Sequence, residues 1–312
     1  MFELLFLGTA AAVPTPERGL PATLVTSGSE RFLVDCGEGT TRQLARGRIG
    51  FRGLRTILLT HLHFDHLGGL AGFVATRALY RQKEAIEIIG SAETIAFARR
   101  YLETTVGAEN EEGAYSLKAV EPGRIVARQG LWVEAFPVKH RGTGSLGYLF
   151  ARESRHPLDP ARLSALGIPE GPQRRALARG ERVALADGRR IDPEMVRLAE
   201  IAGGKMAIVG DSEEVSSLAP FVAGVDALVI EATFLERDSA LARARGHLSA
   251  AEAARLAAEA AVGLLLLTHL SHRYRPQEIA EEAGRIFPNV RVVADFDAVT
   301  VASPPRPRGG DA

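Results

Sequence analysis

The sequence predicts an α/β protein in which helices cover the faces of β-sheets, and three observations lead to this prediction. Short apolar runs bounded by Gly, Pro or polar residues recur along the chain, and runs such as TILLT are typical of strands buried on both faces. Segments with helical periodicity lie between them. In the second half of the chain, strands and helices alternate. That alternation is typical of sheets with helices packed against them.

The expected elements follow one another in chain order. Strands are expected at 3–8 (ELLFLG), 22–28, 31–37, 56–61, 87–90 and 125–140, and later at 206–211, 227–233, 263–269 and 290–295. Helices are expected at 70–82, 91–105 and 249–262. The last of these opens at Ser249 with Glu252 three residues later, which is the pattern of a capping box.

The composition of the chain limits the size of its core, its charged partners and its covalent cross-links. The 312 residues are 46% hydrophobic, enough to bury a large core. The chain has 38 basic and 38 acidic residues, so any site for a polyanion must come from a local patch. A single cysteine, Cys36, excludes an intramolecular disulfide and a thiolate zinc cage. No apolar stretch reaches the ~18 residues that a membrane span needs, and we expect a cytoplasmic protein with no membrane contact.

One interval differs from the rest of the chain. Residues 152–200 contain few aromatics and many Pro, Gly and Arg residues, so they predict an extension and not a second domain with its own core. We therefore expect a single domain at 1–303, with 152–200 inserted as an arm. The tail at 304–312, rich in Pro, Arg and Gly, is expected to be disordered.

Side chains that bind metals gather in THLHFDH, directly after the apolar run TILL. The segment contains His61, His63, Asp65 and His66. If it is extended, side chains 61, 63 and 65 project to one side, so that His61 and His63 can hold one ion while Asp65 leans toward another. His66 follows where the chain bends. Imidazole and carboxylate donors without thiolate suit Zn, Mn or Fe.

Three further candidates end apolar runs elsewhere in the chain. His140 follows WVEAFPVK, Asp211 follows MAIVG and His269 follows LLLLT. A single histidine after a strand is usually an ordinary surface or core residue, and we interpret His156 and His272 in that way. The set of seven is different, because a pair of ions ~3.5–4 Å apart needs a bridging ligand and more donors on each side. The sequence therefore predicts a binuclear metal site.

These motifs resemble a known family. HxHxDH followed by separated His, Asp and His resembles the metallo-β-lactamase superfamily, whose fold is an αββα sandwich. More narrowly, ELLFLGTAAAVPTPERG, LVDCGEGTTRQL, IEATF, GHLSA and THLSHRY are similar, in this order, to motifs of ribonuclease Z, the tRNA 3′-processing endonuclease. The resemblance covers about residues 3 to 274.

The resemblance implies a role for each residue of the site. His61, His63 and His140 would hold one zinc, Asp65, His66 and His269 the other, and Asp211 would bridge them, with manganese as an alternative metal. Asp65 would also act as general base. His247 would donate a proton to the leaving oxygen with the help of Glu231, since a carboxylate beside an imidazole fixes its tautomer and raises its pKa. The alternative is a purely structural role, in which His247 packs against the helix N-terminus and Glu231 pairs with an arginine.

The resemblance also implies how precursor tRNA would be held. Family members carry an arm with a Gly-Pro motif that grips the tRNA body, and Gly171 and Pro172 match it. Arg273 would hold a phosphate, with a structural salt bridge as the alternative. The family is commonly homodimeric. The phosphate contacts of the arm would come from a basic patch of Arg174, Arg175, Arg179 and Arg182.

Several positions depart from the family pattern. The glycines of the first loop are Ala10 and Ala12 here, and because a Cβ disfavours positive φ, we expect a loop that differs from the family or does not need that conformation. Phe64 replaces a glycine between the metal ligands. Three functions are therefore weighed: the tRNA endonuclease, a hydrolase of another phosphodiester or small molecule such as a lactone or thioester, and a non-catalytic RNA-binding module.

Overall fold

The computed structural model describes residues 1–80, 84–107, 114–142, 144–201 and 203–302. The described chain divides into a main unit, Met1–Ala151 with Lys205–Ala302, and a second unit that contains Arg152–Gly204. The expected disordered tail at 304–312 and the last two residues of the helix expected at 70–82 lie outside the described residues.

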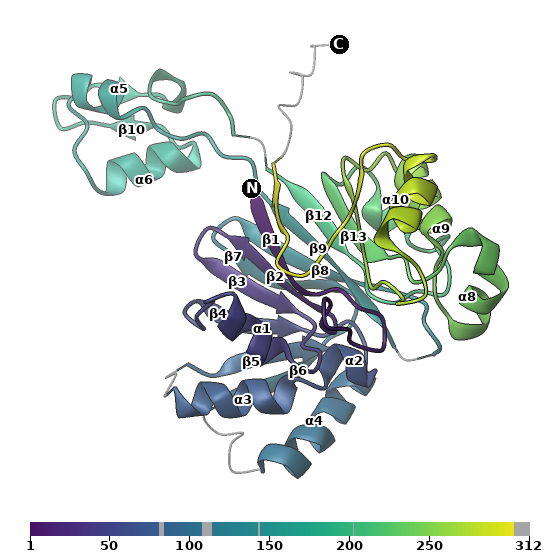
Figure 1. Ribbon diagram of the computed structural model, residues 1–312. Coiled ribbons are helices and arrows are strands. Elements are labelled where there is room, and N and C mark those ends of the chain that lie inside the picture. The colour runs from purple at the N-terminus through teal and green to yellow at the C-terminus, as the bar shows by residue number, and fades with distance from the viewer. Residues whose placement is uncertain (81–83, 108–113, 143, 202, 303–312) are drawn as a thin grey trace. The chain divides into compact units, whose positions relative to one another are not determined.

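The main unit is built on two seven-stranded sheets (Figure 1). The first sheet has the strand order β16 (Ala298–Val301), β1 (Phe2–Gly8), β2 (Ala22–Ser27), β3 (Glu30–Val34), β4 (Leu54–Leu58), β5 (Ile86–Gly90) and β6 (Tyr115–Ala119). The second has the order β15 (Val290–Val292), β14 (Leu265–Thr268), β13 (Ala227–Glu231), β12 (Lys205–Ile208), β9 (Leu146–Arg152), β8 (Leu131–Pro137) and β7 (Gly123–Arg128). Strands β3 to β6 are parallel, and so are β12 to β15.

Helices cover the outer face of each sheet. The first sheet packs against α1 (Thr40–Arg46), α3 (Leu70–Leu79) and α4 (Ala92–Val106), and the second against α7 (Ala219–Val222), α9 (Ala250–Glu259) and α10 (Pro276–Gly284). Shorter elements are α2 (Phe64–Leu67), η3 (Glu236–Asp238) and α8 (Ser239–Arg245). A third apolar layer lies between the two sheets and draws on both, from Phe6 and Phe32 to Tyr148 and Val229. The αββα sandwich is therefore confirmed.

Capping serines determine where two of the helices begin. Ser249 caps α9, because its hydroxyl accepts a hydrogen bond from Glu252 N while the Glu252 carboxylate accepts one from Ser249 N at 2.8 Å. The predicted capping box is confirmed. Ser91 caps α4 in a similar way by accepting from Thr94 N.

The second unit contains α5 (Pro160–Ala165), α6 (Pro172–Arg179), the short hairpin of β10 (Val183–Ala184) and β11 (Arg190–Ile191), and η2 (Pro193–Met195). These elements enclose a small apolar core. The expectation of an extension without a core was wrong, because its apolar residues are too far apart in sequence to form a pattern and converge only through the turns. The buried side chains are Leu163, Ile168, Leu177, Ile191 and Val196.

Phe150 tests the layer between the sheets. Its ring is fully buried and meets Phe32 edge-on at 5.5 Å and Phe2 at 6.3 Å between centroids. We expect Phe150→Ala to lower the free energy of unfolding by about 3–5 kcal/mol, since it leaves a cavity that rigid strands cannot close. Phe150→Leu should cost clearly less. Urea denaturation monitored by circular dichroism checks this, and equal losses would contradict the packing argument.

Candidate metal centre

The candidate ligands lie at the carboxyl ends of strands from both sheets. His61 lies three residues beyond the end of β4, Asp211 lies three beyond the end of β12, and His269 directly follows β14. His140 lies three residues beyond β8. Because the carboxyl ends of parallel strands share one edge of a sheet, residues far apart in sequence meet there.

The segment that contains the first four candidates is not extended throughout. His63 is the N-cap of α2, so Asp65 and His66 lie on a single helical turn. The predicted alternation of 61, 63 and 65 along a strand was therefore wrong at Asp65. The helical turn has the same effect by another route, because it places Asp65 and His66 in a second group of donors with Asp211 and His269.

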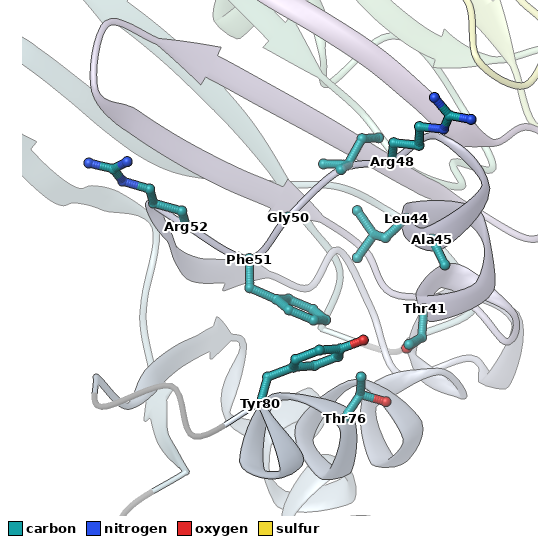
Figure 2. A pocket seen from close by; sticks show the side chains of 10 residues that line it. Thr41, Leu44, Ala45, Arg48, Gly50, Phe51, Arg52, Thr76 and Tyr80 are labelled. Atoms are coloured by element: carbon teal, nitrogen blue, oxygen red, sulfur yellow. The ribbon is translucent and has the colours of Figure 1, made fainter.

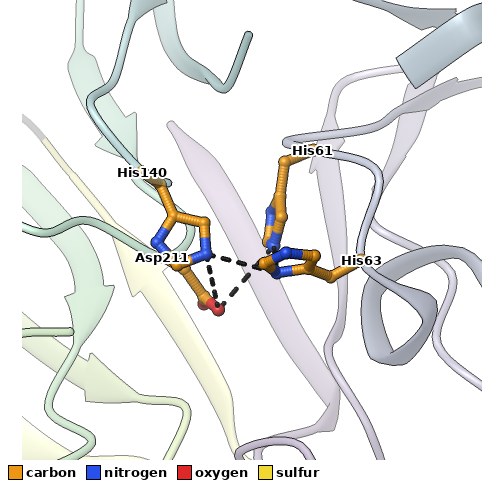
Figure 3. Close-up of side chains that lie close together, drawn as sticks. All are labelled: His61, His63, His140 and Asp211. Carbon is orange, nitrogen blue, oxygen red and sulfur yellow. Dashed lines mark hydrogen bonds and ion pairs between the residues drawn. The ribbon is translucent and has the colours of Figure 1, made fainter. Parts of the chain in front are cut away.

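The first group joins three imidazoles and a carboxylate (Figure 3). His63 Nδ1 lies 3.0 Å from His61 Nε2 and 3.2 Å from His140 Nε2. Asp211 Oδ2 lies 3.7 Å from His61 Nε2 and 3.9 Å from His140 Nε2. Nitrogen and oxygen donors thus face one another around a common point.

The second group uses the other oxygen of the same carboxylate. Asp211 Oδ1 lies 3.3 Å from His66 Nε2 and 3.3 Å from His269 Nε2. Asp65 Oδ2 lies 3.6 Å from His66 Nε2 and 3.5 Å from His269 Nε2. The structure brings all seven predicted side chains together in two groups that share Asp211.

Hydrogen bonds behind the candidate ligands fix the rings of His61 and His66. Asp35 accepts from His66 Nδ1 at 2.8 Å and from the Thr60 hydroxyl at 2.9 Å. That hydroxyl lies 3.0 Å from His61 Nδ1. With Nδ1 occupied, Nε2 of each ring is left to face the centre. Sequence reasoning missed Asp35, although it ends the apolar run RFLV in the same way that the other candidates end theirs.

The second-sheet histidines are held in the same way. His140 Nδ1 donates to Gly246 O at 2.8 Å, and His269 Nδ1 lies 2.9 Å from the Thr233 hydroxyl. The Thr233 hydroxyl in turn donates to Glu231. Both rings therefore present Nε2 to the centre in a fixed tautomer.

Burial and charge prepare these side chains to bind a cation. Burial lowers the pKa of His61, His63 and His140, so their imidazoles are neutral and keep a lone pair for a metal. Burial would raise the pKa of Asp211, but His269 and His66 hold it well below its usual value. The first group thus combines three neutral imidazoles with a carboxylate that stays charged. In the second group burial would lower the pKa of His66, but Asp211 and Asp35 hold it well above its usual value.

The residues present fit a divalent metal. His66 Nε2 and Asp211 Oδ1 are buried and make no hydrogen bond to any part of the described chain, which is costly unless another group satisfies them. A cation between them would do so. The donors are imidazoles and carboxylates, the set that suits zinc and manganese. This is a metal-binding site.

His247 and Glu231 lie beside the metal centre. Both Glu231 oxygens lie 3.1 Å from His247 Nδ1, and Ser212 N donates to the same carboxylate at 2.8 Å. Burial opposes a charge on His247, yet Glu231 raises its pKa to about 9. The His247 ring lies 5.4 Å from that of His269. The alternative in which Glu231 pairs with an arginine is not what the structure has, since Glu231 contacts His247.

The first loop keeps a left-handed backbone despite its alanine. Ala12 has a φ of 54°, and its N–H donates to Asp65 Oδ2 at 3.2 Å. The expectation of a loop that differs or avoids this conformation was wrong at Ala12, where the chain accepts a strain of roughly 1 kcal/mol. Ala10 does not have positive φ.

Phe64 and Arg273 are exposed and lie within four residues of candidate ligands in the sequence, and we call such residues the rim of the centre. The two differ in how firmly they are held. The Arg273 side chain is exposed and makes no ion pair or hydrogen bond to another described residue, so the structural salt bridge proposed as its alternative role is absent there. Phe64 is 56% exposed, but its ring packs edge-on against Tyr101 at 6.0 Å between centroids. Phe64 is therefore a fixed apolar surface next to the ligands.

The candidate substrate-binding residues of the second unit differ in whether their side chains already have partners within that unit. Gly171, with a φ of 128°, and Pro172 start α6. Arg174 donates to Ile168 O, and Arg179 pairs with Glu181. Arg182 pairs with Asp192. Arg175 is exposed and makes no side-chain contact of this kind with any described residue. The expected patch is thus partly neutralised by acids of the same unit.

A separate pocket of about 490 Å³ lies between α1, the following loop and α3 (Figure 2). Its surface is mainly apolar, with the Phe51 and Tyr80 rings 5.9 Å apart and Arg48 and Arg52 at its rim. None of its described lining residues is a His, Cys, Asp or Glu. The acid–base and ligand chemistry of the main unit lies at the metal centre and not in this pocket.

Comparisons with known proteins decide the family. The family model for the anti-Pycsar protein Apyc1 matches residues 2–155. Ribonuclease Z of Bradyrhizobium diazoefficiens is 47% identical over 301 residues, covering 96% of this chain and 100% of that protein. The chain belongs to the ribonuclease Z family. Ribonuclease Z of Archaeoglobus fulgidus is 34% identical over 305 residues, covering 96% of this chain and 98% of that protein.

Solved structures agree on the fold. Human tRNase Z, short form, matches with a TM-score of 0.67 at 24% identity, covering 96% of this chain and 100% of that one. The metallo-β-lactamase fold protein YhfI from Bacillus subtilis matches with a TM-score of 0.69 at 19% identity, covering 96% of this chain and 98% of that one. The match to ribonuclease Z thus extends over nearly the whole chain, and the resemblance seen in the motifs is confirmed.

Asp35 offers a test of the second group that leaves every ligand in place. We expect Asp35→Asn to weaken metal binding about 10- to 100-fold, because His66 loses the charged acceptor that fixes its tautomer. Competition with a chromogenic chelator measures this. Asp226→Asn is the control, since Asp226 accepts from Lys205 N before the start of β13 and away from the ligands. Unchanged affinity in Asp35→Asn would contradict the role assigned to Asp35.

Proposed function

We infer that this chain is a metal-dependent endoribonuclease that removes the 3′ trailer of precursor tRNA by hydrolysing one phosphodiester and leaves a 3′ hydroxyl on the tRNA. Full-length relatives named ribonuclease Z support the reaction. The observation that carries it is the buried Asp211 carboxylate, whose two oxygens face two separate groups of histidines. Such an arrangement suits a phosphodiester better than a single-metal site would.

We propose two zinc ions, with manganese as an alternative. His61, His63 and His140 would hold one, and Asp65, His66 and His269 the other, with Asp211 between them. When bound, such a pair makes water more acidic and neutralises charge that grows on the phosphoryl oxygens.

The protein's own residues would direct the protons. Asp65, held by Ala12 N at 3.2 Å, is placed to accept a proton from the attacking water. His247 would donate a proton to the leaving 3′ oxygen of the tRNA. Glu231 contacts His247 Nδ1 and so leaves Nε2 free to face the substrate.

Residues other than the candidate metal ligands would hold the tRNA. The exposed side chain of Arg273, which pairs with no other described residue, suits a phosphate near the centre. In the second unit, Gly171 and Pro172 match the family's Gly-Pro motif, and we assign Arg174, Arg175 and Arg179 to the tRNA body. Arg175 is the most available of the three. Surface pairs such as Arg179–Glu181 contribute little and can be exchanged for a phosphate.

A hydrolase of another phosphodiester is the second candidate. The match to the Apyc1 model over residues 2–155 and the presence of Phe64 at the rim favour it. A homodimer and a cytoplasmic location stay predictions from the resemblance. In the described residues, no helix is long and apolar enough to cross a membrane.

Cleavage of a precursor tRNA tests the proposal directly. With zinc or manganese, the purified protein should cut a 3′-extended precursor after the last nucleotide of the mature tRNA. His247→Ala should slow this by about 10²- to 10⁴-fold, the contribution typical of a general acid, with metal content unchanged. Rates from gel assays and metal content from elemental analysis give the two readouts. Turnover of bis-p-nitrophenyl phosphate alone would favour the second candidate.

Arg175 tests the second unit. We expect Arg175→Ala to weaken precursor tRNA binding several-fold and to lower the salt dependence by about one phosphate contact. Turnover of bis-p-nitrophenyl phosphate should not change, because a small diester does not extend beyond the metal centre. Filter binding at several salt concentrations measures the effect. An equal loss with both substrates would contradict a role in holding RNA.

A further inference from the structure

Arg141 lies next to two parts of the active centre. It follows the ligand His140 in sequence, and its side chain crosses Gly246, the residue before His247. A Cβ built on Gly246 would lie 2.8 Å from Arg141 Cγ and 3.3 Å from Cδ. Any residue larger than glycine at 246 would therefore displace the Arg141 stem. The stem thus lies beside the residue that precedes His247, whose ring is 5.5 Å from that of His140.

The backbone of Arg141 is held in an unfavourable conformation. Its φ is 47°, in the left-handed region that residues with a Cβ avoid. Glu213 accepts a hydrogen bond from Arg141 N at 3.0 Å, and Lys139 O accepts one from Glu213 N at 2.9 Å. A glycine would fit this position at lower cost. Strain of this kind persists where a side chain must point in a given direction.

The guanidinium of Arg141 has no partner within the part of the chain that the structure describes. Arg141 is exposed, and its side chain makes no ion pair or hydrogen bond with any described residue. The nearby carboxylate of Glu213 contacts the backbone N–H instead. An arginine held at its backbone, whose charged end has no partner in the described chain and lies beside a centre that cleaves phosphodiesters, is suited to a phosphate.

We propose that Arg141 binds the phosphate on the 5′ side of the last nucleotide retained in the mature tRNA. This rests on the proposed function, in which His247 protonates the 3′ oxygen of that nucleotide. The neighbouring phosphate on the His247 side is then that nucleotide's own 5′ phosphate. Arg141 thereby sets the register of the RNA, since holding this phosphate fixes which diester reaches the metal centre. Arg141 is a substrate-binding residue and takes no part in proton transfer.

The test combines a variant with a modified RNA. Arg141→Ala should lower kcat/KM for precursor tRNA about 10-fold, the loss expected for a charged hydrogen bond. A larger fraction of the product should also be cut at a neighbouring phosphodiester. Replacing the proposed phosphate by a neutral methylphosphonate should cost the wild type the same amount and the variant nothing further. The same replacement two nucleotides into the trailer should leave the effect of Arg141→Ala intact. Additive losses at the proposed phosphate would overturn the assignment.

Two further variants separate binding from folding. Arg141→Gly relieves the left-handed strain, so it should melt at a higher temperature than the wild type and still show the 10-fold loss on precursor tRNA. Arg100→Ala, which removes another exposed arginine with no side-chain partner in the described chain, should change neither value.

Turnover of bis-p-nitrophenyl phosphate, which lacks a second phosphate, should be the same in wild type and Arg141→Ala. A parallel loss on this diester would show that Arg141 only supports His140, and would overturn the proposal. If the wild type cleaves the diester but no precursor tRNA, the proposed function fails and the assignment of Arg141 fails with it. If the wild type cleaves precursor tRNA and Arg141→Ala does so equally well, only the assignment of Arg141 fails.

Discussion

The buried Asp211 carboxylate is the interaction on which the rest of the site depends. Its side chain is 3% exposed, and each oxygen faces a different group of ligands. His61 and His66 lie in the segment that follows β4 of the first sheet, whereas His269 follows β14 of the second. A charge this deeply buried is stable only when it is compensated on all sides. Asp211 therefore joins side chains from the edges of both sheets. The centre keeps its geometry only if the two sheets keep their relative position.

Backbone strain is concentrated around this centre. Of the eight described non-glycine residues with positive φ, four belong to it: Ala12, Asp35, Arg141 and His269. Each costs of order 1–3 kcal/mol and persists only where neighbouring contacts over-determine it. Leu270 N donates to Thr9 O and Ala11 N donates to Leu270 O, so the first loop and the end of β14 hold each other. The stability of the two-sheet core sustains these conformations.

The candidate ligands and the exposed rim residues beside them are under different physical constraints. Five of the seven candidate ligands and the carboxylates behind them are buried, and His63 and Asp65 are partly buried, so changes there alter burial and charge and are costly. The rim residues Phe64, Arg141 and Arg273 are exposed, and changes there leave the cage intact. In this chain the departures from the family motifs at Ala12 and Phe64 touch the rim and remove no ligand. Substrate choice can therefore vary on a constant hydrolytic centre.

The sequence alone determined the classes of element and the donors. The HxHxDH segment identified four of the seven candidate ligands, and apolar runs ending in His or Asp identified the other three. Such runs are informative because the strand that delivers a ligand must be buried while the ligand itself must be polar. The pattern could not show that α2 begins at Phe64, since four residues are too few for a helical period.

Only the tertiary structure decided which oxygen of Asp211 faces which histidines and that Asp35 supports His66. It also decided that Arg174 donates to Ile168 O, whereas the Arg175 side chain has no such partner among the described residues. These are contacts between residues distant in sequence, or choices among equivalent side chains. They are fixed by the packing of the two sheets and the turns of the second unit, which no local pattern encodes.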